Sequence, residues 1–103
     1  MDTLQEIQKW YLSQCNDDWE HQNGVSIDTL DNPGWRLEIN LNETDLENVI
    51  FNEVSKGITK DSETSGDNWY NCKVENNKFI GHGGPHKLEE ILNIFLKWSN
   101  SNA

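Results

Sequence analysis

The segment from residue 25 to residue 41 constrains the fold of this chain more than any other stretch. Apolar residues alternate with polar ones on both sides of a central turn: Val25, Ile27 and Thr29, then Trp35, Leu37, Ile39 and Leu41. This alternation places one face of each strand on a core and the other in water. Pro33 presets its own backbone angle and Gly34 tolerates a positive one, which predicts a type II turn over 32–35. Since that turn twists the wrong way for a two-residue hairpin, we expect a wider loop that includes Asp31.

The remaining segments alternate between helical and strand-like periodicity. Thr3-Leu4-Gln5-Glu6 fits a capping box, and the apolar spacing after it predicts a helix over 3–15. Residues 51–58 favour a strand because of their β-branched character, residues 59–68 read as a mobile loop, and residues 69–75 alternate before a turn at Asn76-Asn77. The second strand of this hairpin is expected over 78–80.

The C-terminal part predicts a second terminal helix. Gly81 to Pro85 are expected to break the sheet, with Pro85 in the first turn of the helix. The helix would bury a stripe of apolar residues: Leu88, Ile91, Leu92, Phe95 and Trp98. The predicted fold is therefore α+β, a single antiparallel sheet of four to five strands with the N-terminal and C-terminal helices packed on one face.

Composition limits the classes of partner. The 103 residues suit one domain, which we expect to span 1–103, and the hydrophobic content of 34% means that the core must draw on the ten aromatic residues. Eighteen acidic residues against eight basic ones give a net charge of −10. This charge argues against binding to nucleic acid or an anionic membrane and favours a basic protein partner.

The N-terminal residues and the cysteines bear on location. No apolar run approaches the roughly 20 residues that span a bilayer. The start, Met1-Asp2-Thr3-Leu4-Gln5-Glu6, lacks the basic and apolar regions of a signal peptide. We therefore expect a cytoplasmic protein in which Cys15 and Cys72 are reduced thiols.

The residue types that carry catalysis or bind metals do not form a recognisable constellation. No arginine follows Cys72, as the anion-binding loop of a cysteine-based phosphatase or sulfurtransferase would require. Cys15 precedes an acidic turn that disfavours a thiolate. Asp17, Asp18, Glu20 and His21 match the spacing of neither an EF-hand nor a HExxH helix. We predict no catalytic residue, metal or cofactor, and no enzymatic activity.

Four stretches together resemble the immunity protein 53 family. They are the helix Ile7–Cys15, the run Asp18-Trp19-Glu20-His21 with Gly24, the hairpin Thr29–Trp35, and the tail Gly83-Gly84-Pro85 with Leu88–Leu92. The similarity runs from about Leu4 to Trp98. It implies a bacterial cytosolic protein, encoded beside a polymorphic toxin, that binds the toxin domain and protects the producing cell without catalysis or cofactor.

The acidic composition adds a hypothesis about the contact face. An inhibitor of a basic nuclease can occupy the groove that nucleic acid would fill and be steered there by charge. Trp19 inside the acidic run and Trp69 on the polar face of its strand are candidate exposed anchors. The predicted partner-binding residues are Asp17, Asp18, Trp19, Glu20, Asp31 and Trp69.

Two other interpretations stay open at this point. The turn from Gly81 to His86 could belong to a small-molecule-binding or enzymatic domain, with His82 and His86 in a concave pocket. A generic nucleic-acid mimic would bind many basic proteins, whereas an immunity protein should discriminate strongly between partners.

Overall fold

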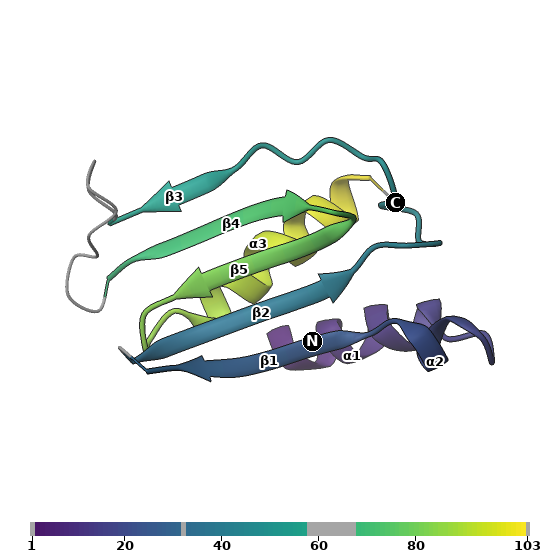
Figure 1. Cartoon of the computed structure of the whole chain (residues 1–103), viewed down its shortest axis with the longest axis horizontal. Coiled ribbons are helices and arrows are strands. Elements are labelled where there is room, and N and C mark those ends of the chain that lie inside the picture. The colour runs from purple at the N-terminus through teal and green to yellow at the C-terminus, as the bar shows by residue number, and fades with distance from the viewer. Residues whose placement is uncertain (1, 32, 58–67, 103) are drawn as a thin grey trace.

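The computed structural model describes residues 2–31, 33–57 and 68–102. The chain forms one antiparallel sheet in the order β1-β2-β5-β4-β3, and the long helices α1 and α3 lie on the same face of it (Figure 1). The predicted α+β architecture is confirmed. Its elements in chain order are α1 Thr3–Gln14, α2 Trp19–Gln22, β1 Val25–Leu30, β2 Gly34–Asn40, β3 Val54–Lys56, β4 Tyr70–Glu75, β5 Lys78–Gly83 and α3 Leu88–Ser101.

Helix α1 begins with a capping box that lies one residue earlier than predicted. The Asp2 carboxylate accepts a hydrogen bond from the Gln5 backbone N–H at 2.8 Å, and the Gln5 side chain accepts one from the Asp2 N–H at 3.3 Å. Aspartate is as good an N-cap as threonine, and glutamine supplies the return bond as well as glutamate does. The predicted helix is therefore confirmed, with Asp2 as its cap in place of Thr3.

The β1–β2 hairpin has the predicted strands and a loop that includes Asp31. Leu30 pairs with Gly34, so residues 31–33 connect the strands. The predicted type II turn includes Asn32, which lies outside the described residues. Gly34 is the first residue of β2, where a Cβ atom would lie 2.4 Å from the carbonyl oxygen of Gly83. Only glycine permits this close approach of β2 to β5.

The middle of the chain contributes a short edge strand. β3 covers Val54–Lys56, inside the predicted 51–58, whose last residue lies outside the described part. The predicted mobile loop over 59–68 also lies outside it, apart from the exposed Asn68.

The predicted break at Gly81 is wrong. β5 continues through Gly81 and His82 to Gly83, which pairs with Trp35. Gly81 pairs with Leu37 of β2 and with Cys72 of β4, so it lies inside the sheet and continues the strand. Helix α3 then begins at Leu88, and Pro85 precedes the helix instead of occupying its first turn.

The core lies between the sheet and the two long helices. Fully buried side chains come from the helix-facing side of the central strands and from α3: Leu37, Ile39, Cys72, Phe79, Ile91 and Phe95. The rings of Phe79 and Phe95 meet edge to face, with centroids 5.2 Å apart. Burying each large apolar side chain contributes about 1.5–3 kcal/mol. None of the helices in the described part of the chain is long and apolar enough to cross a membrane.

Candidate partner-binding surface

Two loops meet at one end of the molecule. The first connects α1 to β1 and contains α2, and the second follows β2 over residues 41–49. The indole N–H of Trp19 joins them by donating to the Asn42 carbonyl at 2.7 Å. Above this contact lies a hollow of about 380 Å³ lined by Asp18, Trp19, Gln22, Asn23, Asn42, Glu43 and Glu47. We call the carboxylates of these loops the acidic end: Asp17, Asp18, Glu20, Glu43, Asp45 and Glu47.

Local hydrogen bonds fix the first loop. The Asn16 side chain accepts from the backbone N–H groups of Asp18 at 3.0 Å and Trp19 at 2.8 Å, which starts α2. The Glu20 carboxylate accepts from the N–H groups of Asn16 and Asp17, each at 3.0 Å. Hydrogen bonds from its own backbone N–H and from these two groups lower the pKa of Glu20. Glu20 is therefore a fixed carboxylate at neutral pH.

The second loop is anchored to the hydrophobic core. Leu46 is 2% exposed and belongs to the core, and the Thr44 hydroxyl donates to the Leu41 carbonyl at 2.8 Å. The Glu47 carboxylate accepts from the Glu43 N–H at 3.1 Å. Glu43 has a φ angle of 62°, in the left-handed region, and the chain bends there. The carboxylates of Glu43 and Glu47 both line the hollow.

The structure corrects the expected exposure of both candidate anchors. Trp19 is 1% exposed, and its ring lies 6.1 Å from the rings of Trp10 and Tyr11. Trp69 is 6% exposed and precedes β4, so strand alternation does not determine its face. Neither indole is an exposed apolar anchor.

The predicted acidic residues fall into two places. Asp17, Asp18 and Glu20 lie together at the acidic end, whereas Asp31 follows β1 at the opposite end of the hairpin (Figure 1). Glu43 and Glu47 join the first group, although the sequence analysis did not single them out. No local pattern links residues 18 and 43, since the Trp19–Asn42 hydrogen bond that joins their loops is a tertiary contact.

The sheet face away from the helices carries a compact ion network. Glu38 accepts from Arg36 at 2.7 Å and from Lys78 at 3.0 Å, and these hydrogen bonds lower the pKa of Glu38. Arg36 Nη1 lies 2.9 Å from His82 Nε2. Because a guanidinium only donates, His82 Nε2 must accept and be unprotonated. Burial, and then repulsion by Arg36 and Lys73, lowers the pKa of His82 in the same sense.

This geometry does not support a site at the Gly81–His86 turn. His82 lies on the open face of β5 and contacts Arg36, while His86 is exposed beyond the strand. Neither histidine lines any of five hollows on the described surface.

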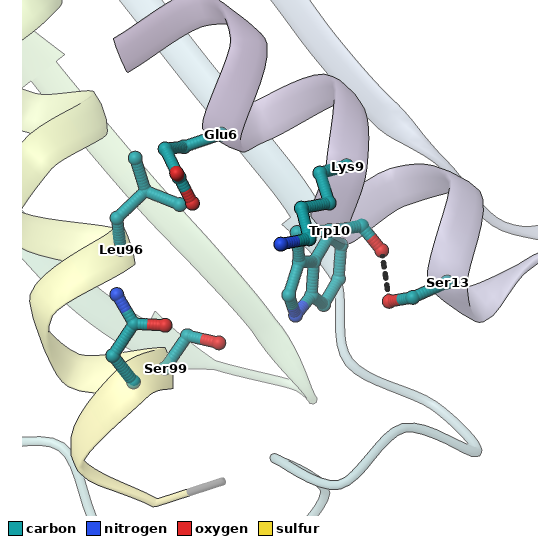
Figure 2. Close-up of a pocket in the computed structure, with 7 residues that line it drawn as sticks. Glu6, Lys9, Trp10, Ser13, Leu96 and Ser99 are labelled. Carbon is teal, nitrogen blue, oxygen red and sulfur yellow. Dashed lines mark hydrogen bonds between the residues drawn. The ribbon is translucent and has the colours of Figure 1, made fainter. Parts of the chain in front are cut away.

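Another hollow lies in the groove between α1 and α3. It has a volume of about 180 Å³, and Figure 2 shows Glu6 and Lys9 of α1 and Ser99 of α3 around it. The Ser13 hydroxyl donates to the Trp10 carbonyl at 2.6 Å and so is held by its own helix. Cys72 is buried, which raises the pKa of its thiol to about 12. Among the described residues, no cluster of three or more His, Cys, Asp or Glu side chains could hold a metal ion.

Searches of curated proteins and of solved structures found no similar protein. The model of the family described as Immunity protein 53 matches residues 4–100, which include both loops of the acidic end and all described helices and strands except the ends of α1 and α3. The chain belongs to the Immunity protein 53 family.

Proposed function

We propose that this chain neutralises a basic nuclease domain of a bacterial polymorphic toxin by forming a stoichiometric complex with it in the cytoplasm. Membership of the family supports an immunity function and, with it, a protein partner, the toxin. The identity of the toxin as a nuclease and the stoichiometric mode of inhibition are the parts that we add. The chain would act by binding alone, without catalysis or cofactor.

The acidic end is the observation that carries the nuclease part of the proposal. Its two loops bring Asp18, Glu43 and Glu47 around one hollow, and His21 is the only basic side chain within residues 15–24 and 41–53. A nuclease holds a polyanion in a positively charged groove. A surface with fixed carboxylates can fill such a groove, and its field raises the rate of encounter.

A pull-down from the native host identifies the partner. Tagged chain is washed at moderate salt and the retained proteins are identified by mass spectrometry. We expect a single toxin domain encoded beside the chain. Equal recovery of many basic proteins would instead indicate a nonspecific acidic surface and contradict an immunity function.

A titration then tests the mode of inhibition. The toxin domain, separated from the complex, is mixed with nucleic acid and increasing amounts of the chain. We expect cleavage to fall linearly and to stop at a fixed molar ratio. Full activity at an excess of the chain would contradict inhibition by binding, and a toxin that cleaves no nucleic acid would contradict the nuclease part.

Charge reversal at Asp17 and Asp18 tests the acidic end. In the double variant Asp17→Lys and Asp18→Lys, we expect the association rate at low salt to fall on the order of tenfold, because electrostatic steering is lost. The matched control is Glu89→Lys with Glu90→Lys, which makes the same charge change on exposed residues where α3 begins, at the other end of the molecule (Figure 1). Equal association rates for both double variants would contradict the acidic end as the contact face.

A further inference from the structure

Strand β1 has a free edge. Asn40 donates its N–H to the Gly24 carbonyl at 3.1 Å, and the register pairs Ser26 with Glu38 and Asp28 with Arg36. In an antiparallel ladder, hydrogen-bonded pairs alternate with pairs that are not hydrogen-bonded. The N–H and C=O groups of Val25, Ile27 and Thr29 therefore point away from β2, and within the described part of the chain no other backbone group bonds to them.

This edge lacks several of the features that discourage strand addition, and its one charged side chain is Asp28. Edge strands are commonly short, interrupted by bulges, or marked by lysine or proline. β1 has six residues in unbroken register with β2, and its sequence Val-Ser-Ile-Asp-Thr-Leu contains neither lysine nor proline. Ile27, in the middle, is 39% exposed.

The two sides of the edge differ in chemistry. Val25, Ile27 and Thr29 share the helix side of the sheet with their partners Ile39, Leu37 and Trp35. On that side a hollow of about 410 Å³ lies between α1 and the start of β1, lined by Ile7, Gln8, Tyr11, Asn23, Gly24 and Val25. On the other side stand Ser26 and the exposed Asp28.

We propose that the free edge of β1 binds one extended strand of the toxin domain. This inference rests on the proposed function. The outward N–H and C=O groups of Val25, Ile27 and Thr29 would pair with the backbone of that strand. Apolar side chains of the strand enter the hollow beside Tyr11, and alternate Lys or Arg side chains lie on the face of Asp28.

Charge complementarity favours this occupant over a second copy of the chain. Each copy carries a net charge of −10, so pairing two copies at β1 brings like charges together. A basic strand instead finds Asp28 in the middle of the edge, Asp31 after its last residue and the acidic end before its first. The two separated groups of predicted acidic residues thus lie at the two ends of one strand.

Amide hydrogen exchange, read residue by residue by NMR on the unmodified chain, tests the proposal. The free chain is compared with its complex with the toxin domain encoded beside it, after co-production. In the free chain, the amides of Val25, Ile27 and Thr29 should exchange faster than those of Ser26 and Asp28, which bond to β2. In the complex, we expect exchange at the three outward amides to slow at least about tenfold. Unchanged rates there would overturn the proposal.

A pair of variants adds a binding test. Ile27→Pro removes an outward N–H without removing a hydrogen bond to β2, and proline is tolerated at such edge positions. Ile27→Ala shortens the side chain and keeps the N–H. We expect the dissociation constant of the proline variant to be at least about tenfold higher than that of the alanine variant. Equal constants would overturn the proposal, and if circular dichroism shows the proline variant unfolded, the exchange experiment decides.

The possible failures can be told apart. If the unmodified chain binds no toxin domain, the proposed function fails and the inference fails with it. If the chain binds and inhibits the toxin while the three amides exchange as in the free chain, only the inference fails. If those amides become protected in the free chain at high concentration and light scattering gives a dimer mass, a second copy occupies the edge and the proposal is overturned.

Discussion

The two edges of the sheet are built in opposite ways. At one edge, all six residues of β1 pair with β2 in continuous register. At the other, β3 has only three paired residues and ends in Lys56. Short length and lysine both discourage the addition of another strand. β3 therefore has two features that discourage the pairing of another strand, whereas β1 has neither of them.

Two glycine substitutions give the largest expected effects, one where β2 meets β5 and one just after β3. Gly34→Ala places a Cβ atom 2.4 Å from the Gly83 carbonyl oxygen, where β2 meets β5. Gly57→Ala places one 2.3 Å from the Asn68 carbonyl oxygen, at a backbone angle of +73°. We expect each to lower the free energy of unfolding by on the order of 1–3 kcal/mol, as overpacking or left-handed strain does.

Local exchange distinguishes the two glycine variants. Gly34→Ala should speed amide exchange where β2 pairs with β5, because the added Cβ atom meets the Gly83 carbonyl oxygen, and Gly57→Ala should affect only the β3–β4 side. Urea unfolding gives the global change. If both variants raised the exchange rates of the same amides equally, the two regions of the sheet would not be independent.

Adding a lysine to each edge gives an intermediate effect. Ile27→Lys gives β1 the protection that β3 already has, so we expect toxin binding to weaken about tenfold, equivalent to about 1.4 kcal/mol. Ser55→Lys makes the same charge change on exposed β3 and should leave binding unchanged. Titration calorimetry of both variants is the measurement. A loss of affinity with Ser55→Lys alone would place the partner at the edge formed by β3 and contradict binding at β1.

Acidification should have the smallest effect and should not distinguish the edges. The pKa of His82 is lowered in the folded chain, so the unfolded chain binds more protons below about pH 6.5. The free energy of unfolding therefore decreases as the pH is lowered through this range. The pKa of Glu38 is also lowered, so its contribution is lost as pH falls below about 4.5. Since the Glu38 side chain is 26% exposed, we expect its share to be roughly 0.2–1 kcal/mol.

Two single variants separate these contributions. His82→Gln should flatten the dependence of unfolding free energy between pH 7 and 5.5, and Glu38→Gln should flatten it below pH 5. Urea unfolding across this range is the measurement. A rise in stability on acidification from pH 7 to 5.5 in the unmodified chain would contradict the sign.

Local periodicity predicted most of the elements, because alternation of apolar residues is a property of neighbours in sequence. The hairpin over 25–41 and the stripe of α3 are of this kind. The break expected at Gly81 failed because that glycine is paired on both sides, with Leu37 of β2 and Cys72 of β4. Glycines look alike in sequence whether they bend the chain or continue a strand.

The candidate site was less predictable, because its residues come together only in the folded chain. The exposure of Trp19 depends on Tyr11, Trp10 and Asn42, which cover it from other segments. Glu43 and Glu47 belong to the acidic end for the same reason. The acidic run at 17–20 was visible in the sequence, but the second loop that completes it was not.

The buried indole of Trp19 has a consequence for the thermodynamics of recognition. One hydrogen bond to Asn42 joins loops 23 positions apart and holds them in place before any partner arrives. Ordering flexible loops at an interface costs about 0.5–1.5 kcal/mol for each immobilised side chain. Here that loss of conformational entropy occurs during folding of the chain, so an incoming protein meets carboxylates at a spacing that is already fixed.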